Sequence, residues 1–528
     1  MSLQRLTAAI CAAFALTSTA ASLPLSTLSS TLTNVDFGNL SPAAHAQLQN
    51  IEDNFTNYDH CELACSLLSI FLPQQFTSPH LADYTPLPYW SVQQALVVPA
   101  CRIDVASAQN ISTVVQISKF TQCPFAVKSG GHAAEAGTSS IQNGILINMA
   151  KLNMVALSED RTTAAIGPGN TWYDVYKVLD PLGVSVVGGR EAGVGVGGLT
   201  LGGGISYFSP RYGWACDNIR SYEVILADGS IVNATPQSHA DLYWALRGGS
   251  GTNFGIVSRF DAVAFEQGLL WGGSRFYTPD VNASLIEAYS KFIVDAPSDD
   301  DASLYIAGGY EASLGGYVLV SGPAYAKPIA NASIFNNLNA IPSLGDTTGI
   351  GNMADFSVAL NQTAFLRWKT VTFKNDANLF KAVWAIFVEE TKTILDVPGI
   401  IPFWALQPLS LNILEQMAKN GGNVLGLSAA DGPLCMLTVA VMNMNWGWSN
   451  AADDARVIGA LDRFVSRAVD LATSMKLQNR FIYMNYASLT QDVFGGYGPE
   501  NEARLRKVQE KYDPNGVFKT LQPGYFKL

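Results

Sequence analysis

The segment from Gly188 to Gly204 limits the possible folds most, because nine of its seventeen residues are glycine. Each glycine inside a helix costs about 1 kcal/mol relative to alanine. We therefore predict a chain of tight turns here and no helix. Bare backbone of this kind lets a flat ligand approach closely, and its N–H groups can bind a pyrophosphate without a helix. A packed turn region that binds no ligand is the alternative.

The same segment contains a literal dinucleotide-binding pattern, Gly193-x-Gly195-x-x-Gly198, with Asp217 downstream. That pattern requires a helix opening at its last glycine, because the helix N-terminus binds the pyrophosphate. Here three further glycines, 202–204, follow within about one turn. We therefore discount a nicotinamide-dinucleotide site of the Rossmann type.

The N-terminus predicts secretion. Arg5 precedes an apolar stretch, Leu6 to Leu16, and small residues follow at 17–22. This order is typical of a signal peptide, residues 1–21, with cleavage after Ala20 or Ala21; a signal anchor is the alternative. No later segment reaches about 18 uninterrupted apolar residues, as a membrane span requires. We expect a secreted, extracellular protein that does not reside in a membrane.

Charge and glycosylation signals agree with this compartment. The formal net charge is −11 and the basic residues are scattered, so nucleic acid and anionic membranes are poor partners. Six N-x-S/T sequons predict N-glycosylation, at Asn54, Asn110, Asn233, Asn282, Asn331 and Asn361.

The cysteines indicate an oxidising compartment. Four of them, Cys61, Cys65, Cys101 and Cys123, lie within 63 residues of one another, which predicts an N-terminal disulfide cluster of undetermined pairing. Zinc binding by Cys61 and Cys65 is the rival interpretation, but no matching Cys or His pair stands at ligand spacing. No metal site is predicted.

A chain of 528 residues is too long for one core, so we expect several domains. Residues 22–89 form a helical, disulfide-bonded region. Residues 90–268 mix short strands, turns and helices, including a hairpin with the turn Asp228-Gly229. Glycine density falls in 269–480, which we interpret as a second domain with strands at 317–320 and 434–442 and a helix at 453–475. Residues 481–528 add tyrosines and a charged helix at 499–512.

Three motifs, in order along the chain, together resemble the berberine-bridge-enzyme-like branch of the vanillyl-alcohol-oxidase (para-cresol methylhydroxylase) flavoprotein superfamily. The first is Pro124-Phe-Ala-Val-Lys-Ser-Gly-Gly-His132. The second is Gly195-Val-Gly-Gly-Leu-Thr-Leu-Gly-Gly-Gly204, followed by Tyr212-Gly-x-x-x-Asp217-Asn218. The third is Tyr483-Met-Asn-Tyr486 with Tyr512-Asp-Pro-Asn-Gly-Val-Phe518. The resemblance covers residues 90 to 528.

The resemblance implies an α+β fold: a two-part FAD-binding domain with an inserted substrate domain of antiparallel sheet and helices. It also implies FAD joined covalently to His132. Many relatives add a second bond from a cysteine, but Glu191 occupies that position and Cys216 is too far along the chain, so a single link is expected. Val194 matches a small residue that admits dioxygen, which favours an oxidase. The implied cofactor-binding residues are His132, Lys128, Ser129, Gly130, Gly131, Gly193, Val194, Gly197, Gly198, Gly203 and Asn485.

The implied reaction is hydride transfer from a small-molecule substrate to the flavin, which dioxygen reoxidises, with Tyr486 as the catalytic base. A purely structural Tyr486 is the alternative. Ala134, Ser488 and the acid-free run Leu437 to Met442 depart from the family pattern and favour a hydrophobic, secondary-metabolite substrate. A secreted carbohydrate or alcohol oxidase, and a flavin-bearing scaffold or pericyclic template that oxidises nothing, are the rival functions. Gln407 is a weak candidate for substrate contact.

Overall fold

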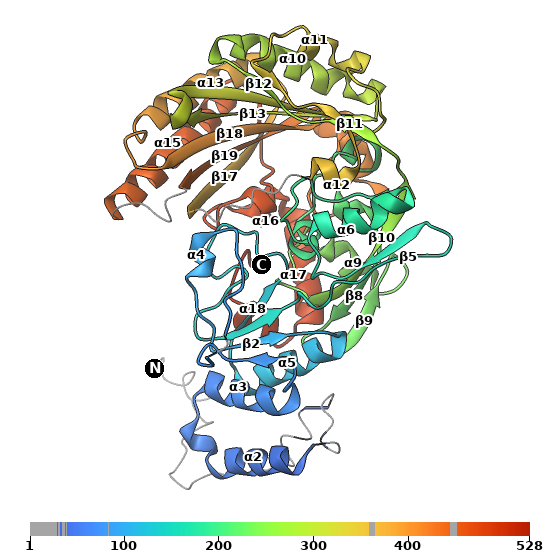
Figure 1. Ribbon diagram of the computed structural model, residues 1–528, viewed down its shortest axis with the longest axis vertical. Helices are drawn as coiled ribbons and strands as arrows, with labels where there is room; N and C mark the ends of the chain where they lie inside the picture. Colours follow the sequence, from blue (N-terminus) through green and yellow to red (C-terminus); the bar gives the residue numbers. More distant parts are fainter. Residues whose placement is uncertain are drawn as a thin grey trace, which may run out of the picture.

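The computed structural model describes residues 29, 32–33, 37, 40–82, 84–357, 365–443 and 451–528. The predicted leader, residues 1–21, and the sequon at Asn361 lie outside this part of the chain. Three β-sheets and their helices form an elongated molecule, with helices α2 (Pro42–Asp53) and α3 (His60–Phe71) at one end and the largest sheet at the other (Figure 1). The α+β class is confirmed.

The first sheet has the strand order β1-β2-β4-β3, with β2 and β3 parallel to β4. Helix α5 (Ala108–Thr121) connects β2 to β3. Helix α3 packs beneath this sheet and is joined to it by the disulfides Cys61–Cys123 and Cys65–Cys101. The predicted disulfide cluster is therefore confirmed, and zinc binding by Cys61 and Cys65 is ruled out. The strands are β1 (Phe76–Thr77), β2 (Cys101–Asp104), β3 (Phe125–Lys128) and β4 (Ile145–Asn148).

The second sheet is antiparallel, with the order β5-β6-β10-β8-β9 and β7 paired with the far end of β10. The predicted hairpin is β8–β9, and Gly229 adopts a φ of 85° in its turn. Helices α6 (Trp172–Leu179) and α9 (Ala240–Leu246) pack against this sheet. The strands are β5 (Val155–Leu157), β6 (Thr163–Ile166), β7 (Val184–Val186), β8 (Ile219–Ile225), β9 (Ile231–Ala234) and β10 (Ile256–Glu266).

The third sheet is antiparallel and has ten strands, in the order β15-β12-β14-β13-β18-β19-β17-β20, with β11 and β16 at one edge. Its strands are β11 (Leu270–Gly272), β12 (Arg275–Tyr277), β13 (Ala302–Glu311), β14 (Gly316–Tyr325), β15 (Gly345–Asp346), β16 (Gly349–Gly351), β17 (Phe365–Lys374), β18 (Ile400–Leu409), β19 (Leu434–Asn443) and β20 (Gln478–Asn479).

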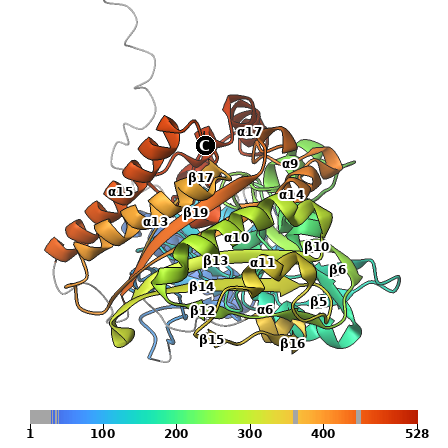
Figure 2. The same cartoon turned by 90° about the horizontal axis from the view of Figure 1, so that it is seen from above.

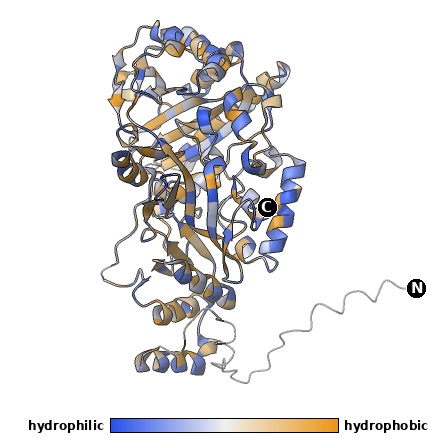
Figure 3. Ribbon diagram, turned by 90° about the vertical axis from the view of Figure 1, so that its right-hand side faces the viewer, coloured by the Kyte–Doolittle hydropathy of each residue, from blue (hydrophilic) through white to orange (hydrophobic). Residues whose placement is uncertain are grey.

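Helices α10 (Asn282–Asp295), α13 (Ala377–Lys392) and α15 (Ala451–Ser474) cover the outer face of this sheet (Figure 2). Successive side chains of a strand point to opposite faces. On β18, Trp404 accordingly packs against Trp384 and Phe387 of α13, whereas its neighbour Phe403 points to the inner face. The interior strands are largely hydrophobic, whereas the peripheral helices carry both hydrophobic and hydrophilic residues (Figure 3). None of the described helices is both long enough and apolar enough to span a bilayer.

Residues 481–528 return to the first two sheets through α17 (Pro499–Tyr512) and α18 (Val517–Leu521). Helix α17 has the predicted bounds.

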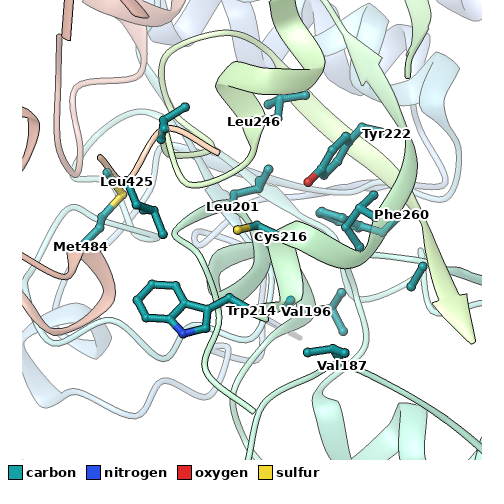
Figure 4. Close-up of a cluster of buried hydrophobic side chains, with 14 of the residues drawn as sticks. Val187, Val196, Leu201, Trp214, Cys216, Tyr222, Leu246, Phe260, Leu425 and Met484 are labelled. Carbon is teal, nitrogen blue, oxygen red and sulfur yellow. The ribbon is translucent and has the colours of Figure 1, made fainter. Parts of the chain in front are cut away.

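The expectation that the glycine-rich segment holds no helix was wrong. Val196–Leu201 forms a short helix, α7, that begins after Gly195 and ends at Gly202. Val196 and Leu201 are buried, in the same core as Trp214 and Met484 (Figure 4). Tertiary packing therefore outweighs the low helix propensity of Gly197 and Gly198, which weakens one argument against the dinucleotide pattern.

Candidate active site

A cavity of about 400 Å³ lies between the glycine-rich loops and the inner face of the ten-stranded sheet. Its floor comes from residues 129–135 and 190–202, and its roof from strands β17, β18 and β19. Residues 483–487 close one side. The three motifs from the sequence thus meet around one space.

The two glycine loops cross with their backbones in contact. A Cβ atom on Gly195 would lie 2.2 Å from the Gly130 nitrogen, and one on Gly130 would lie 2.5 Å from the Gly195 nitrogen. The Ser129 hydroxyl strengthens this crossing: it donates to the Pro168 carbonyl (2.6 Å) and accepts from the Gly197 N–H (3.3 Å). By contrast, a Cβ on Gly198 would meet nothing within 4 Å, although Gly198 lines the cavity.

His132 lies at the cavity wall with its ring fixed on two sides. The Trp90 indole stacks on it, with centroids 4.2 Å apart and an interplanar angle of 13°. The Nε2 atom lies 3.0 Å from Glu191 Oε2. Among the described residues the Nδ1 atom makes no hydrogen bond. Neither ring nitrogen therefore makes a hydrogen bond within the described residues, although Nε2 lies beside the Glu191 carboxylate.

Tyr486 lies in the turn Met484–Tyr486, where it lines the cavity and packs against the sheet. Trp368 of β17 stacks on it at 5.7 Å and 23°, and Tyr483 meets it edge-on at 4.8 Å. Trp368 also contacts Trp90 and Phe403. The substrate-facing wall is therefore largely aromatic, and Met442 of β19 extends its apolar surface.

Arg190 brings a half-buried cation into the cavity. Its Nη2 donates to the Gln407 Oε1 at 2.5 Å, across the boundary between the glycine-rich loop and β18. Burial alone would lower the pKa of Arg190, but the hydroxyls of Tyr486, Tyr207 and Tyr305 around it raise the pKa above its ordinary value.

Most of the predicted cofactor-binding residues line this cavity, and three do not. Those that do are Ser129, Gly130, Gly131, His132, Val194, Gly197, Gly198 and Asn485, together with the predicted base Tyr486. The amide of Asn485 donates to the Leu199 carbonyl at the end of α7 and to the Tyr483 hydroxyl, both at 3.0 Å. Asn485 therefore also fixes the glycine-rich segment in place.

The exceptions are Lys128, Gly193 and Gly203. Lys128 lies behind the first loop, with Nζ 3.4 Å from the Ser129 and Gly130 carbonyls, and burial lowers its pKa to about 8. Gly193 lies beside the His132 ring, and Gly203 packs on Trp214 and Tyr483 at a φ of 124°. These three residues support the loops from the side that faces away from the cavity.

The residues that depart from the family pattern also lie in or near this cavity. Ala134 and Met442 line the cavity, Ser488 lies just outside it, and Val194 contributes to its wall. Gln407 does not line the cavity and contacts Arg190 instead. Asp217, downstream of the dinucleotide pattern, is fully buried in an ion pair with Arg247.

The sequence did not identify Trp90, Trp368, Phe403 or Arg190 as site residues. The aromatic residues gave no local signal. A signal for Arg190 did exist, because Arg190 and Glu191 are the only charged residues between Gly188 and Gly204.

Comparison with known proteins agrees with this arrangement. Residues 99–235 match the FAD binding domain family, and residues 482–523 match the berberine and berberine-like family. The chain is 39% identical to the FAD-dependent monooxygenase tpcD of Cochliobolus heterostrophus, over 89% of this chain and 95% of that protein.

The chain belongs to the berberine-bridge-enzyme-like family of FAD-dependent oxidoreductases. Its fold is that of berberine bridge enzyme from Eschscholzia californica (TM-score 0.68, 17% identity, covering 88% of this chain and 99% of that one). It is also that of xylooligosaccharide oxidase from Myceliophthora thermophila C1, solved with xylobiose (TM-score 0.70, 19% identity, 86% and 98%). The class of substrate must therefore be inferred from the residues that line the cavity.

The residues present fit a bound FAD. The crossing loops expose glycine backbone where a side chain on Gly198 would enter the cavity, and the ring of His132 is fixed at the wall. The volume is within the usual range for ligand sites, about 300–1,000 Å³.

Proposed function

We propose that this protein is a secreted oxidase that holds FAD covalently and removes a hydride from a small hydrophobic substrate. The observation that supports it best is the convergence of the glycine loops, His132 and Tyr486 on one aromatic-walled cavity. The matched FAD-binding segments, 99–235 and 482–523, fall within the two proposed parts of the FAD domain, 90–268 and 481–528. Residues 269–480 form the substrate domain in this proposal.

His132 is the attachment residue. Because its Nε2 faces Glu191, the nitrogen left for the link is Nδ1. Glu191 stands where a second linking cysteine would have to be, so the link is single. The predicted glycine-loop residues, with Val194 and Asn485, would surround the flavin, and Lys128 would support the phosphate loop. The bound flavin supplies hydride acceptance and reoxidation by dioxygen.

Tyr486 takes the substrate proton. It lines the cavity, and its ring is fixed between Trp368 and Tyr483. The wall of Trp90, Trp368, Phe403 and Met442 excludes water and favours a flat apolar substrate over a sugar.

Secretion is supported by the two disulfides and by the surface position of several sequons. Asn54, Asn233 and Asn331 are exposed, whereas Asn110 and Asn282 are half-buried. We expect a mature N-terminus at residue 21 or 22 and a loss of mass on enzymatic deglycosylation. N-terminal sequencing that finds Met1 would contradict secretion.

Acid precipitation tests the covalent link. The parent protein should leave a yellow pellet, whereas His132→Ala should release its flavin into the supernatant, because His132 is the only histidine among the described residues that line the cavity. The Trp90→Phe variant, which keeps an aromatic ring against His132, serves as the control and should stay yellow. Flavin retained in the pellet of His132→Ala would refute the assignment.

The reaction type is tested by measuring dioxygen consumption and hydrogen peroxide formation. A panel of vanillyl alcohol, glucose and cellobiose, mixed with the holoprotein, should yield one hydrogen peroxide per dioxygen consumed with the aromatic alcohol. Incorporation of ¹⁸O from ¹⁸O₂ into the product would instead indicate a monooxygenase, the activity named for tpcD. Product formation without oxygen consumption would indicate a non-oxidising template.

A further inference from the structure

We infer that Arg190 binds a carboxylate of the substrate, which makes the substrate an aromatic alcohol that also carries an acid group. Gln407 is the positioning residue that holds Arg190 in place. This inference rests on the proposed function, because it names the substrate class of the same site.

Arg190 differs from the other charged residues of the cavity in having no charged partner. Among the described residues that line the cavity, the acidic and basic side chains other than tyrosine are those of Glu135, Glu191, His132 and Arg190. Glu191 lies 3.0 Å from His132 Nε2, and Glu135 lies 3.8 Å from Arg367, which does not line the cavity. Arg190 makes no ion pair within the described part of the chain. Its charge is therefore left for a bound molecule.

The protein groups that contact Arg190 are neutral. Its Nη2 donates to Gln407 Oε1 at 2.5 Å. Its guanidinium carbon lies 5.4 Å from the ring centroid of Tyr305 and 5.9 Å from that of Tyr207, and such rings attract a cation without neutralising it. Arg190 is half-buried, so its charge is partly shielded from water and still reachable from the cavity. A carboxylate bound there would gain charge-assisted hydrogen bonds.

Gln407 fixes the direction of the guanidinium. Its side chain is buried on β18 and does not line the cavity. Because the guanidinium is a planar fork of five N–H donors, fixing one nitrogen also directs the others. The remaining donors of Arg190 meet no carboxylate of the described chain, and a substrate carboxylate can accept two of them in parallel.

The apolar wall near Arg190 accounts for the rest of the substrate. Phe403 and Gln407 are four residues apart on β18, so their side chains point to the same face of the sheet. Phe403 lines the cavity together with Trp368 and Met442. The cation and the aromatic wall therefore lie along one face. This arrangement fits a molecule that places a ring against the wall and an acid group at Arg190.

The test measures binding without turnover. Benzoate and benzamide have nearly the same shape, and both lack the alcohol that the flavin would oxidise, but only benzoate is charged at neutral pH. Isothermal titration calorimetry gives the dissociation constant of each compound for the oxidised holoprotein. The parent should bind benzoate more tightly than benzamide by about 10-fold or more, because hydrogen bonds between charged groups are roughly twice as strong as neutral ones.

Substitutions of Arg190 test the source of this preference. Arg190→Gln should abolish the preference for benzoate, because the side chain keeps N–H donors and loses the charge. Arg190→Lys should keep part of it, since an ammonium group retains the charge without the planar fork. The matched control is Arg259→Gln, which removes a half-buried arginine paired with Glu223 in the second sheet and should leave the preference unchanged.

Gln407→Glu tests the positioning role. The substitution keeps the size of the side chain and places a carboxylate beside Arg190, so the protein itself now supplies the opposite charge. The preference for benzoate should fall as it does in Arg190→Gln, while the affinity for benzamide stays at the parent value. A purely structural Gln407 would leave the ratio of the two affinities unchanged.

Equal affinities for the two compounds in the parent, or no measurable binding of either, would overturn the inference. A preference for benzoate that survives in Arg190→Gln would overturn it as well, and one that survives in Gln407→Glu would overturn the positioning role. Failure of the proposed function appears separately, as the absence of flavin reduction by every alcohol tested, because neither benzoate nor benzamide is oxidised.

Discussion

The hydroxyl of Tyr486 is the smallest part of the molecule on which the proposed chemistry depends. The ring itself is fixed by Trp368 on one face and Tyr483 at its edge, and neither contact involves the oxygen. Packing and proton transfer can therefore be separated by removing a single atom. The proposed flavin-binding loops lie elsewhere in the chain, at 129–132 and 193–204.

Replacing Tyr486 with phenylalanine should slow flavin reduction by about 10²–10⁴-fold, the usual contribution of a positioned base. Flavin content and melting temperature should stay at parent values, because the ring contacts remain. Anaerobic stopped-flow reduction measures the rate. A rate within a few-fold of the parent would exclude Tyr486 as the base and favour the non-oxidising template.

Two glycines only three residues apart should respond differently to alanine. Gly195→Ala places a methyl group 2.2 Å from the Gly130 nitrogen, so the crossing loops must separate and both stability and flavin content should fall. Gly198→Ala meets no protein atom within 4 Å and lies in α7, where alanine favours the helix by about 0.5–1 kcal/mol. Its methyl group enters the cavity, so the substitution should weaken flavin retention without lowering stability.

Thermal unfolding and flavin absorbance of both variants separate these effects, with Gly268→Ala as the control in open space outside the site. Equal melting temperatures for Gly195→Ala and the parent would contradict the backbone contact.

At the scale of elements, prediction from sequence succeeded where the signals are local. The β8–β9 hairpin and helix α17 follow from signals within their own segments. Helix α7 could not be predicted, because buried neighbours such as Trp214 and Met484 stabilise it against its glycines.

The same distinction applies to the candidate site. His132, the glycine loops and Tyr486 belong to sequence motifs and were predicted as site residues, whereas the aromatic residues of the cavity roof were not predicted. Trp368 and Phe403 approach each other only because β17 and β18 both pair with β19, and these pairings join segments far apart in the sequence. A long-range pairing of this kind leaves no trace in a short window of sequence.

Helix α3 is joined to the first sheet by disulfides, and these can be removed without changing any residue of the candidate site. The disulfide Cys65–Cys101 joins it to β2 and closes a separation of 36 residues. Replacing both cysteines with alanine should lower the free energy of unfolding by about 3–4 kcal/mol, because the unfolded chain regains loop entropy. Flavin content should be unchanged, since the cavity lies beyond the first sheet.

Denaturant titration measures this loss. Cys435→Ala, which removes a buried thiol that forms no disulfide, controls for lost packing. A double variant as stable as the parent, or one that has lost its flavin, would contradict the separation of α3 from the site.

At the scale of the whole molecule, Arg247 joins residues 216–217 to the loop 419–423. Its guanidinium donates to Asp217 Oδ1 at 3.0 Å and to the Cys216 carbonyl at 3.1 Å. It also donates to the carbonyls of Lys419, Asn420 and Gly422. Both Arg247 and Asp217 are fully buried, and Asn423 donates to the same Asp217 oxygen at 2.9 Å. One ion pair thus fixes the loop 419–423 against the residues that follow α7.

Asp217→Asn should therefore destabilise the molecule by about 3–5 kcal/mol, because it keeps the shape of the side chain but leaves the Arg247 charge buried without a carboxylate. The exposed pair Arg161–Glu266 provides the matched control, and Glu266→Gln should change stability by less than about 1 kcal/mol. Denaturant unfolding followed by tryptophan fluorescence and by flavin release compares the two variants. Since Asp217 lies outside the cavity lining, flavin should leave Asp217→Asn only as the protein unfolds. Equal midpoints for Asp217→Asn and Glu266→Gln would show that this buried pair does not hold the loop 419–423 in place.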